Sequence, residues 1–140
     1  MEKEEIVARA RMVGQQRNYV EREIERMMLS MLDLNNSLTT IQNMKDETGL
    51  VPIGGGSFIR AKLDPENVLV PIGAGYITEF GVDAAKEEID KRVKMTEKAI
   101  QSLRGELKRM DDEFMKLEQL YAQQHGHAGH VHTGKEGGGS

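Results

Sequence analysis

The chain has 140 residues and a formal net charge of −4 with histidine neutral; 38% of its residues are hydrophobic and 30% are charged. Three Phe, three Tyr and no Trp are few large side chains for a compact globule of this length, and they suit a long helical structure better. The charge balance gives no electrostatic case for binding nucleic acid or a membrane surface, and the lack of cysteine excludes disulfide and thiol chemistry.

The start of the chain, MEKEEIVARARM, is charged where a signal peptide would be apolar. No apolar run approaches the roughly 18–20 residues that a membrane-spanning helix needs. The lack of cysteine also fits a reducing compartment. The sequence therefore predicts a soluble, cytoplasmic protein.

Residues 1–48 are predicted to form one long helix that ends near Gly49, because glycine is a typical residue just past a helix end. Two apolar series run through it with alternating steps of four and three residues, the spacing that defines the seam of a coiled coil. The first series is Ile6, Val13, Val20, Met27, Leu34 and Ile41, and the second is Ala10, Arg17, Ile24, Met31 and Leu38.

Residues 49–81 break this period. The stretch LVPIGGGSFI, which starts at Leu50, is nearly repeated as LVPIGAGYIT from Leu69. Short β-branched runs around glycine turns predict two β-hairpins. Hairpins of this size bury too little apolar surface to be stable alone, and their edges can pair with other chains. We therefore expect an oligomerisation surface made by Val51, Ile53, Phe58, Ile59, Val70, Ile72, Tyr76 and Ile77.

The same glycine-rich loops raise the alternative of a phosphate-binding loop. Ile59 and Thr78 stand where the third glycine of a dinucleotide-binding motif would fall, and no lysine comes next at the spacing of a phosphate loop. A strand is predicted next, where both motifs require a helix. The pattern therefore favours turns.

Residues 82–125 restore the seam spacing and predict a second long helix that ends at Gly126. Its first series is Val82, Ile89, Thr96, Leu103, Met110 and Leu117, and its second is Val93, Ile100, Leu107, Phe114 and Tyr121.

Two such helices joined by a compact middle can fold back as an antiparallel pair. If position numbers that sum to 127 share a layer, each layer joins one series to the other, as in Val13 with Phe114. Arg17 then lies opposite Met110, and we expect its guanidinium to reach Asp111 or Glu113. A register shifted by one heptad preserves the pattern and remains open.

Residues 126–140 differ in composition. Histidines and glycines recur in HGHAGHVHTGKEGGGS, which begins one residue earlier at His125, and this composition predicts a disordered tail. Histidine-rich tracts can bind divalent metals, so a metal-handling protein whose tail is the functional part remains an alternative. We assign no metal ligand.

No catalytic constellation falls on the predicted ordered elements, so we expect no enzyme activity and no cofactor. Apolar side chains gather instead at the free ends of the helices, and they form a candidate binding surface: Ile6, Val7, Ala10, Met12, Val13, Phe114, Met115, Leu117, Leu120 and Tyr121. The alternative is that they close the end of the seam, which we favour for Val13, Phe114 and Leu117. Binding and packing stay equally open for Val7, Met12, Met115 and Leu120.

A long helix, two short hairpins around VPIGGGSF and IGAGY, and a second long helix resemble the α-type subunit of the archaeal prefoldin family, over roughly residues 6 to 124. The most specific part is LVPIGGGSFIRAKL followed by IGAGY; Pro71 is a departure from the family's second hairpin. The resemblance implies a mainly α, α+β fold, in which a long antiparallel two-helix coiled coil carries two central β-hairpins that oligomerise into a β-barrel body.

The resemblance also implies a hexamer of two α-type and four β-type prefoldin subunits. It implies an ATP-independent chaperone, a holdase, that captures unfolded polypeptide clients with the tips of its coiled coils and delivers them to a group II chaperonin. The alternative is a self-assembling coiled-coil scaffold or filament-forming homo-oligomer with no client binding.

Overall fold

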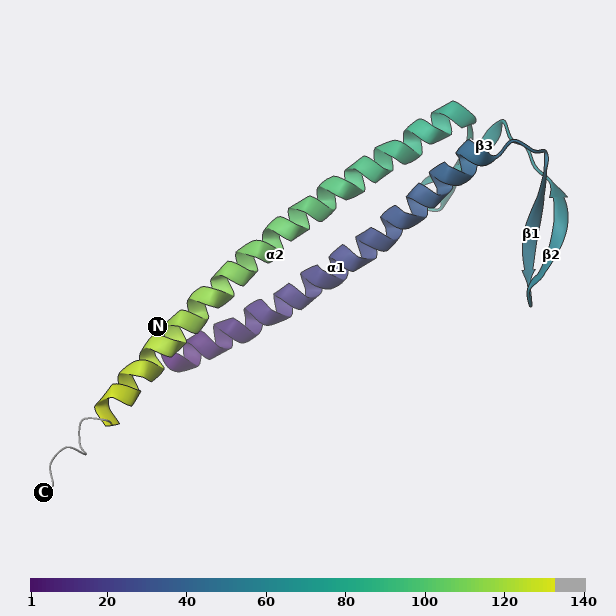
Figure 1. Cartoon of the computed structure of the whole chain (residues 1–140). Helices are drawn as coiled ribbons and strands as arrows, with labels where there is room; N and C mark the ends of the chain where they lie inside the picture. Colours follow the sequence, from purple (N-terminus) through teal and green to yellow (C-terminus); the bar gives the residue numbers. More distant parts are fainter. Residues whose placement is uncertain (133–140) are drawn as a thin grey trace, which may run out of the picture. The chain divides into compact units, whose positions relative to one another are not determined.

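The computed structural model describes the backbone of residues 1–132 and the side chains of residues 1–124. Two antiparallel β-hairpins stand between two long helices (Figure 1), so the predicted fold class is confirmed. The elements are α1 (Lys3–Asn43), β1 (Thr48–Gly54), β2 (Ser57–Lys62), β3 (Asn67–Gly73), β4 (Tyr76–Gly81) and α2 (Val82–His132). No described helix is long and apolar enough to cross a membrane.

The chain divides into two compact units, each with its own part of both helices. The terminal unit comprises Met1–Met27 and the chain from Ala99 onward. The hairpin unit comprises Met28–Lys98 and contains all four strands.

In the terminal unit, the start of α1 lies beside the later part of α2 (Figure 1). The core consists of Ile6, Val13 and Leu117, with Ala10, Met110, Phe114 and Tyr121 packed against it. All of these are positions of the predicted seam, so the heptad spacing identified the buried stripe of this unit correctly.

The helix register in this unit agrees with the predicted layers. The Arg17 Nε atom lies 2.5 Å from the Asp111 Oδ1 atom, next to the predicted layer partner Met110. A shift of one heptad would move the partner of Arg17 by two helical turns, well beyond the reach of this ion pair. The contact of Arg17 with Asp111 was expected from the sequence and is confirmed.

In the hairpin unit, β1 pairs with β2 and β3 pairs with β4, each in antiparallel register and each as a separate two-stranded sheet. The register shifts just before each turn, so that Ile53 and Ile72 occupy β-bulges. Ala74 has a φ of 52° and is the only residue other than glycine with a positive φ in the described part of the chain. The turn Ala74-Gly75 thus repeats the left-handed geometry of the glycines in the first turn.

The first helix ends earlier than predicted, at Asn43, where the Asn43 side-chain amide donates a hydrogen bond of 2.8 Å to the carbonyl of Thr39. Gly49 lies inside β1 and does not cap the helix. A Cβ atom at Gly49 would lie 2.6 Å from the Leu63 Cδ1 atom, so the glycine lets Leu63 cover the strand. Gly49 therefore allows the Leu63 side chain to approach the backbone closely. From the sequence alone, a glycine needed for such a contact looks the same as a glycine that caps a helix.

The second helix ends later than predicted. It continues past Gly126 to His132, so the expected helix end at residue 125 is wrong and residues 126–132 belong to α2. One glycine costs a helix only about 1 kcal/mol relative to alanine, which is too little to end it by itself. Residues 133–140 of the predicted tail lie outside the described residues, as do the side chains of its histidines.

Candidate interaction surfaces

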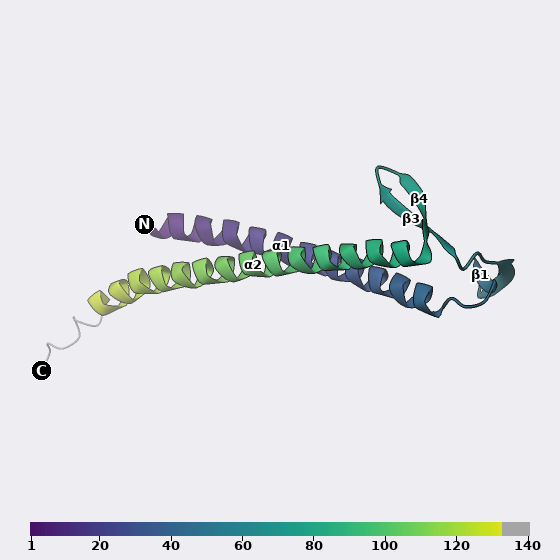
Figure 2. The same cartoon turned by 90° about the horizontal axis from the view of Figure 1, so that it is seen from above.

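The first hairpin, β1–β2, exposes apolar side chains on both of its faces. Cross-strand pairs place Leu50 beside Arg60 on one face and Val51 beside Ile59 on the other. All four side chains are exposed, and Leu50 is 64% exposed. Figure 2 also draws this hairpin clear of the helices of its unit. A two-stranded sheet that is apolar on both faces is marginal in water, so both faces are candidates for burial against another chain.

The second hairpin, β3–β4, differs from the first because one of its faces is covered. Val70 is only 3% exposed, and its cross-strand partner Thr78 is half-buried. Val70 lines a groove of about 700 Å³ together with Ile41 from α1 and Ile89 and Arg92 from α2. The hairpin therefore packs against the helices of its own unit.

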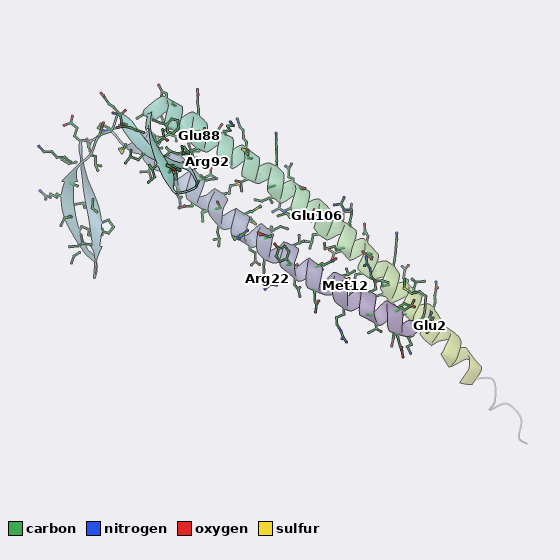
Figure 3. All side chains as sticks on the ribbon, turned by 180° about the vertical axis from the view of Figure 1, so that it is seen from behind. Glu2, Met12, Arg22, Glu88, Arg92 and Glu106 are labelled. Atoms are coloured by element: carbon green, nitrogen blue, oxygen red, sulfur yellow. The ribbon has the colours of Figure 1, made fainter. Side chains whose placement is uncertain are left out.

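The side chain of Arg92 adds a hydrogen bond to the contact between the second hairpin and α2. The Arg92 guanidinium donates a hydrogen bond to the backbone carbonyl of Pro71 in β3. The Arg92 Nε atom also lies 3.5 Å from the Glu88 Oε1 atom, one turn earlier on α2 (Figure 3). Both Arg92 and Glu88 are partly shielded from water, which favours a defined contact over a transient one.

The predicted oligomerisation residues are exposed in the structure with one exception. Burial against its own helices removes Val70 from the candidate surface. Leu50 and Leu69, which are 64% and 69% exposed, add to the exposed apolar surface of the hairpins and were not among the predicted residues. Alternation along the strands places them on the same faces as Phe58 and Ile77, so the strand period alone was a sufficient signal.

The predicted binding residues at the helix ends fall into three groups. Ile6, Val13 and Leu117 are buried in the core of the terminal unit, and Ala10, Phe114 and Tyr121 are packed against it. The remaining four are exposed apolar side chains, and we call them the terminal quartet: Val7, Met12, Met115 and Leu120.

A small apolar groove lies beside Val7, one member of the terminal quartet. It has a volume of about 260 Å³ and is lined by Ile6, Val7, Ala10, Leu117, Glu118 and Tyr121. Of the terminal quartet, Val7 therefore stands next to buried residues of the seam. The groove is thus open to solvent while the core beside it stays closed.

Ion pairs hold the two helices of the terminal unit together beside this surface. The Arg9 Nε atom lies 2.7 Å from the Glu113 Oε1 atom, and Arg17 bonds both Asp111 and, at 2.8 Å, Glu21. The hydrogen bond with Asp111 raises the pKa of Arg17 above its ordinary value, since it stabilises the charged guanidinium. The pairs of Arg9 with Glu113 and of Arg17 with Asp111 join the two helices, while the apolar quartet stays exposed.

The chain is similar to known proteins over most of its length. The model of the family described as Prefoldin subunit matches residues 13–127. Prefoldin subunit alpha 1 of Thermococcus kodakarensis is 31% identical over 96 residues, which cover 65% of this chain and 66% of the relative. Prefoldin subunit alpha of Methanopyrus kandleri is 43% identical over 75 residues, which cover 50% of this chain and 48% of the relative. The matched stretch thus spans less than two thirds of either relative.

A solved structure shares the fold. The cryo-EM structure of filamentous PFD from Methanocaldococcus jannaschii superimposes with a TM-score of 0.62 at 23% identity, and it covers 80% of this chain and 94% of that chain. The family match covers both hairpins and most of both helices. The chain therefore belongs to the prefoldin family, in which it resembles the alpha-type subunits of archaea.

Proposed function

We propose that the chain is a subunit of an ATP-independent chaperone that holds unfolded polypeptides. The observation that carries this proposal is the terminal quartet, Val7, Met12, Met115 and Leu120, which stays exposed beside a seam that is already closed. The names of the relatives, all of them prefoldin alpha subunits, support the same class of protein. The chain is not expected to be an enzyme or to need a cofactor.

The mechanism is apolar contact. Methionine side chains are flexible and polarisable, so a surface with two of them can adapt to many apolar segments. Burial of one such side chain contributes roughly 1.5–3 kcal/mol at best. Capture of a large client therefore requires several subunits that act on it together and raise the effective concentration of binding sites.

Several binding surfaces come together when the subunits assemble into an oligomer. We propose that the exposed hairpin faces join the chain to β-type prefoldin subunits in a hexamer, and that the hexamer passes its clients to a group II chaperonin in the cytoplasm. The exposed, apolar β1–β2 hairpin supports the assembly step, because its faces need a partner to be buried. The family resemblance supports the hexamer and the delivery step.

One observation favours the scaffold alternative. The solved structure that shares this fold is described as filamentous. A filament-forming homo-oligomer would grow from this chain alone, whereas a hexamer needs a second kind of subunit. The native mass of the chain, measured with and without a β-type partner, separates the two assemblies.

The test of client holding compares two variants that lose equal numbers of exposed apolar side chains. In the first, all four members of the terminal quartet are replaced by Ser. In the second, Ser replaces exposed apolar residues of the hairpin unit: Met28, Leu29, Leu32 and Met95. Each variant is assembled with β-type subunits whose own helix ends have been shortened, so that the partner cannot mask the effect.

We expect the first variant to assemble but to lose most of its ability to suppress aggregation of an unfolded test protein. The second variant should assemble and suppress aggregation like the unchanged chain. Equal suppression by both variants would move client binding away from the helix ends. If the unchanged assembly also fails to suppress aggregation, the scaffold alternative replaces the chaperone.

A further inference from the structure

The end of α1, residues 35–43, is rich in residues that form helices poorly, and we call it the polar end of α1. Six of these nine residues are Asn, Ser or Thr. Their short polar side chains hydrogen-bond to nearby backbone groups in non-helical conformations, which lowers their helix propensity. Residues 84–92 of α2, which the predicted layers place opposite, contain none of these three residue types. The sequence thus makes α1 the weaker helix near the hairpins.

Side chains of the polar end bond to the backbone of their own helix. The hydroxyls of Ser37, Thr39 and Thr40 donate to the carbonyls four residues earlier, at 3.2, 3.1 and 2.9 Å. The Asn43 amide does the same at 2.8 Å. Because these carbonyls also accept the backbone bonds of an α-helix, such side-chain bonds weaken and bend the helix slightly. The same side chains can still bond to the backbone after the helix opens.

Few side chains of the polar end are buried. Ile41 is 8% exposed and Leu38 is half-buried, while the other seven residues are exposed. Asn36, Ser37 and Thr40 line the groove of about 700 Å³ in the hairpin unit. Open space therefore lies beside these three side chains in place of a packed neighbour. Low burial and exposed helical hydrogen bonds are typical of a segment that opens locally.

The start of α2, in contrast, is well held. Ala85, Ile89 and Val93 are buried there. Arg92 forms an ion pair with Glu88 one turn earlier and donates a hydrogen bond to β3. The second hairpin is therefore attached to a stable part of a helix, whereas the first hairpin follows the polar end of α1.

We propose that the polar end of α1 is a hinge, which unwinds and re-forms while α2 and the second hairpin stay folded. Residues 44–47, which form neither helix nor strand, connect it to β1. A residue spans about 1.5 Å in a helix and up to about 3.3 Å in an extended chain. Unwinding the nine residues of the polar end lengthens this segment from about 14 Å to as much as about 30 Å.

This extra length lets the first hairpin change direction as one body. The Leu63 NH donates a hydrogen bond of 2.5 Å to the carbonyl of Glu47 and closes the base of the hairpin. The Val82 NH donates one of 3.0 Å to the carbonyl of Glu66, which holds the other connection, Leu63–Glu66, at the start of α2. The first hairpin thus turns about that connection when the polar end of α1 opens.

The hinge goes beyond the proposed function and rests on it only in treating the first hairpin as an assembly surface. The exposed apolar faces of β1–β2 can then meet partner surfaces that lie in different directions. The second hairpin keeps one direction, because Arg92 and the buried Val70 hold it to the helices.

Amide hydrogen exchange of the full chain, followed by nuclear magnetic resonance, tests the opening. We expect residues 39–43 to exchange at least about tenfold faster than residues 88–92 of α2. Their rates should also be similar to one another, since a hinge opens as one unit. Fraying of the helix end alone would give rates that fall steeply from residue 43 towards residue 39.

A variant with a stronger helix tests the cause. It combines three changes at exposed positions of the polar end: Asn35→Ala, Ser37→Ala and Thr39→Ala. Alanine is the best helix former, so exchange at residues 39–43 should become at least about tenfold slower. The matched control makes similar changes at exposed helical positions elsewhere, and it should leave these rates unchanged: Asn18→Ala, Ser30→Ala and Ser102→Ala.

Distances between spin labels test the motion of the hairpin. The chain has no cysteine, so Arg60→Cys or Glu79→Cys, at equivalent positions of the two hairpins, can each be paired with Lys98→Cys on α2. Labelled chains are diluted with unlabelled chains, so that only distances within one chain are measured. The distribution for the first hairpin should be at least about twice as broad as that for the second. The triple alanine variant should narrow the first distribution and leave the second unchanged.

Three results would overturn the proposal: residues 39–43 that exchange as slowly as residues 88–92, a triple alanine variant that exchanges like the unchanged chain, or a first-hairpin distribution that this variant does not narrow. The triple alanine variant keeps the terminal quartet, so it should hold clients as the unchanged chain does. Loss of client holding in the unchanged chain would leave all three hinge measurements as they are. The two proposals therefore fail separately.

Discussion

The guanidinium of Arg92 on α2 donates a hydrogen bond to the backbone carbonyl of Pro71 on β3. This contact fastens the second hairpin to the helix that comes directly after it. The first hairpin has no equivalent contact among the described residues, although it contains the equivalent proline, Pro52. The two copies of one sequence therefore differ in how firmly they are held.

The first prediction concerns this contact. Arg92→Met removes the donor while it keeps an aliphatic side chain against β3. We expect amide hydrogen exchange in β3–β4 to become faster, because local opening no longer breaks a hydrogen bond to a charged donor. Exchange in β1–β2 should not change. Lys94→Met is the matched control, since Lys94 pairs with Asp90 on its own helix, at 3.0 Å. Faster exchange in both variants would show that the effect is not specific to Arg92.

The second prediction concerns the core of the terminal unit. Leu117 is 5% exposed and Leu120, three positions later on the same helix, is 41% exposed. Leu117→Ala should lower the free energy of unfolding by about 2–4 kcal/mol, because it removes buried methyl groups and leaves a cavity. Leu120→Ala should lower it by less than about 1 kcal/mol. Thermal and denaturant unfolding of the two variants measures the difference, and equal losses would contradict the assigned helix register.

The third prediction concerns the second turn. Ala74 has a φ of 52°, a conformation that an alanine side chain disfavours. Ala74→Gly should stabilise the β3–β4 hairpin by up to about 1 kcal/mol, since glycine adopts positive φ without strain. Gly55→Ala makes the converse change in the first turn, where φ is 59°, and should destabilise β1–β2. Amide hydrogen exchange should become slower in β3–β4 of the first variant and faster in β1–β2 of the second. Faster exchange with Ala74→Gly, or slower exchange with Gly55→Ala, would contradict the turn assignment.

The fourth prediction concerns pH. The Asn67 side-chain amide and the backbone NH of Glu66 donate hydrogen bonds to Asp64 and lower its pKa below its ordinary value of 3.8. A carboxyl group with a lowered pKa stabilises the fold above the pKa of the unfolded chain, and that contribution disappears as the pH falls through the folded value. The connection between the hairpins should therefore loosen below pH 3.8.

Asp64→Asn is the control for this pH effect, because the amide cannot titrate in that range. Nuclear magnetic resonance of the backbone amides of Glu66 and Asn67 should show an acid transition in the unchanged chain and none in the variant. An acid transition of equal size in both chains would assign it to other carboxyl groups.

The heptad spacing predicted the long helices and their buried stripe because one seam repeats over many turns and errors at single positions average out. Ile6, Val13 and Leu117 were placed correctly on this basis. The position of a helix end depends on a few residues there, so an error at one of them is not averaged out. α1 ends at Asn43 without a glycine there, while Gly126 fails to end α2, since one glycine costs a helix only about 1 kcal/mol.

The difference between the two hairpins could not be predicted from the repeat itself, because the two sequences are nearly the same. It arises from the segment that succeeds each copy in the chain. Gly81 ends β4 and Val82 begins α2 without an intervening loop, so Ile89 and Arg92 meet the second hairpin. The first hairpin leads through the segment Leu63–Glu66 to another strand and not to a helix. Val70 is therefore buried against the helices, whereas Val51, at the equivalent position of the first hairpin, stays exposed.

Because the turns of the two hairpins are short, each hairpin forms well before the chain meets a partner subunit. Strands joined by a two-residue turn find each other within microseconds, whereas the meeting of two chains is a second-order process that slows as the protein becomes dilute. Newly made chains therefore pass through an interval in which the apolar faces of β1–β2 already exist but have no partner. The length of that interval depends on subunit concentration. The proposed chaperone subunit is thus itself most exposed to aggregation when its partner subunits are scarce.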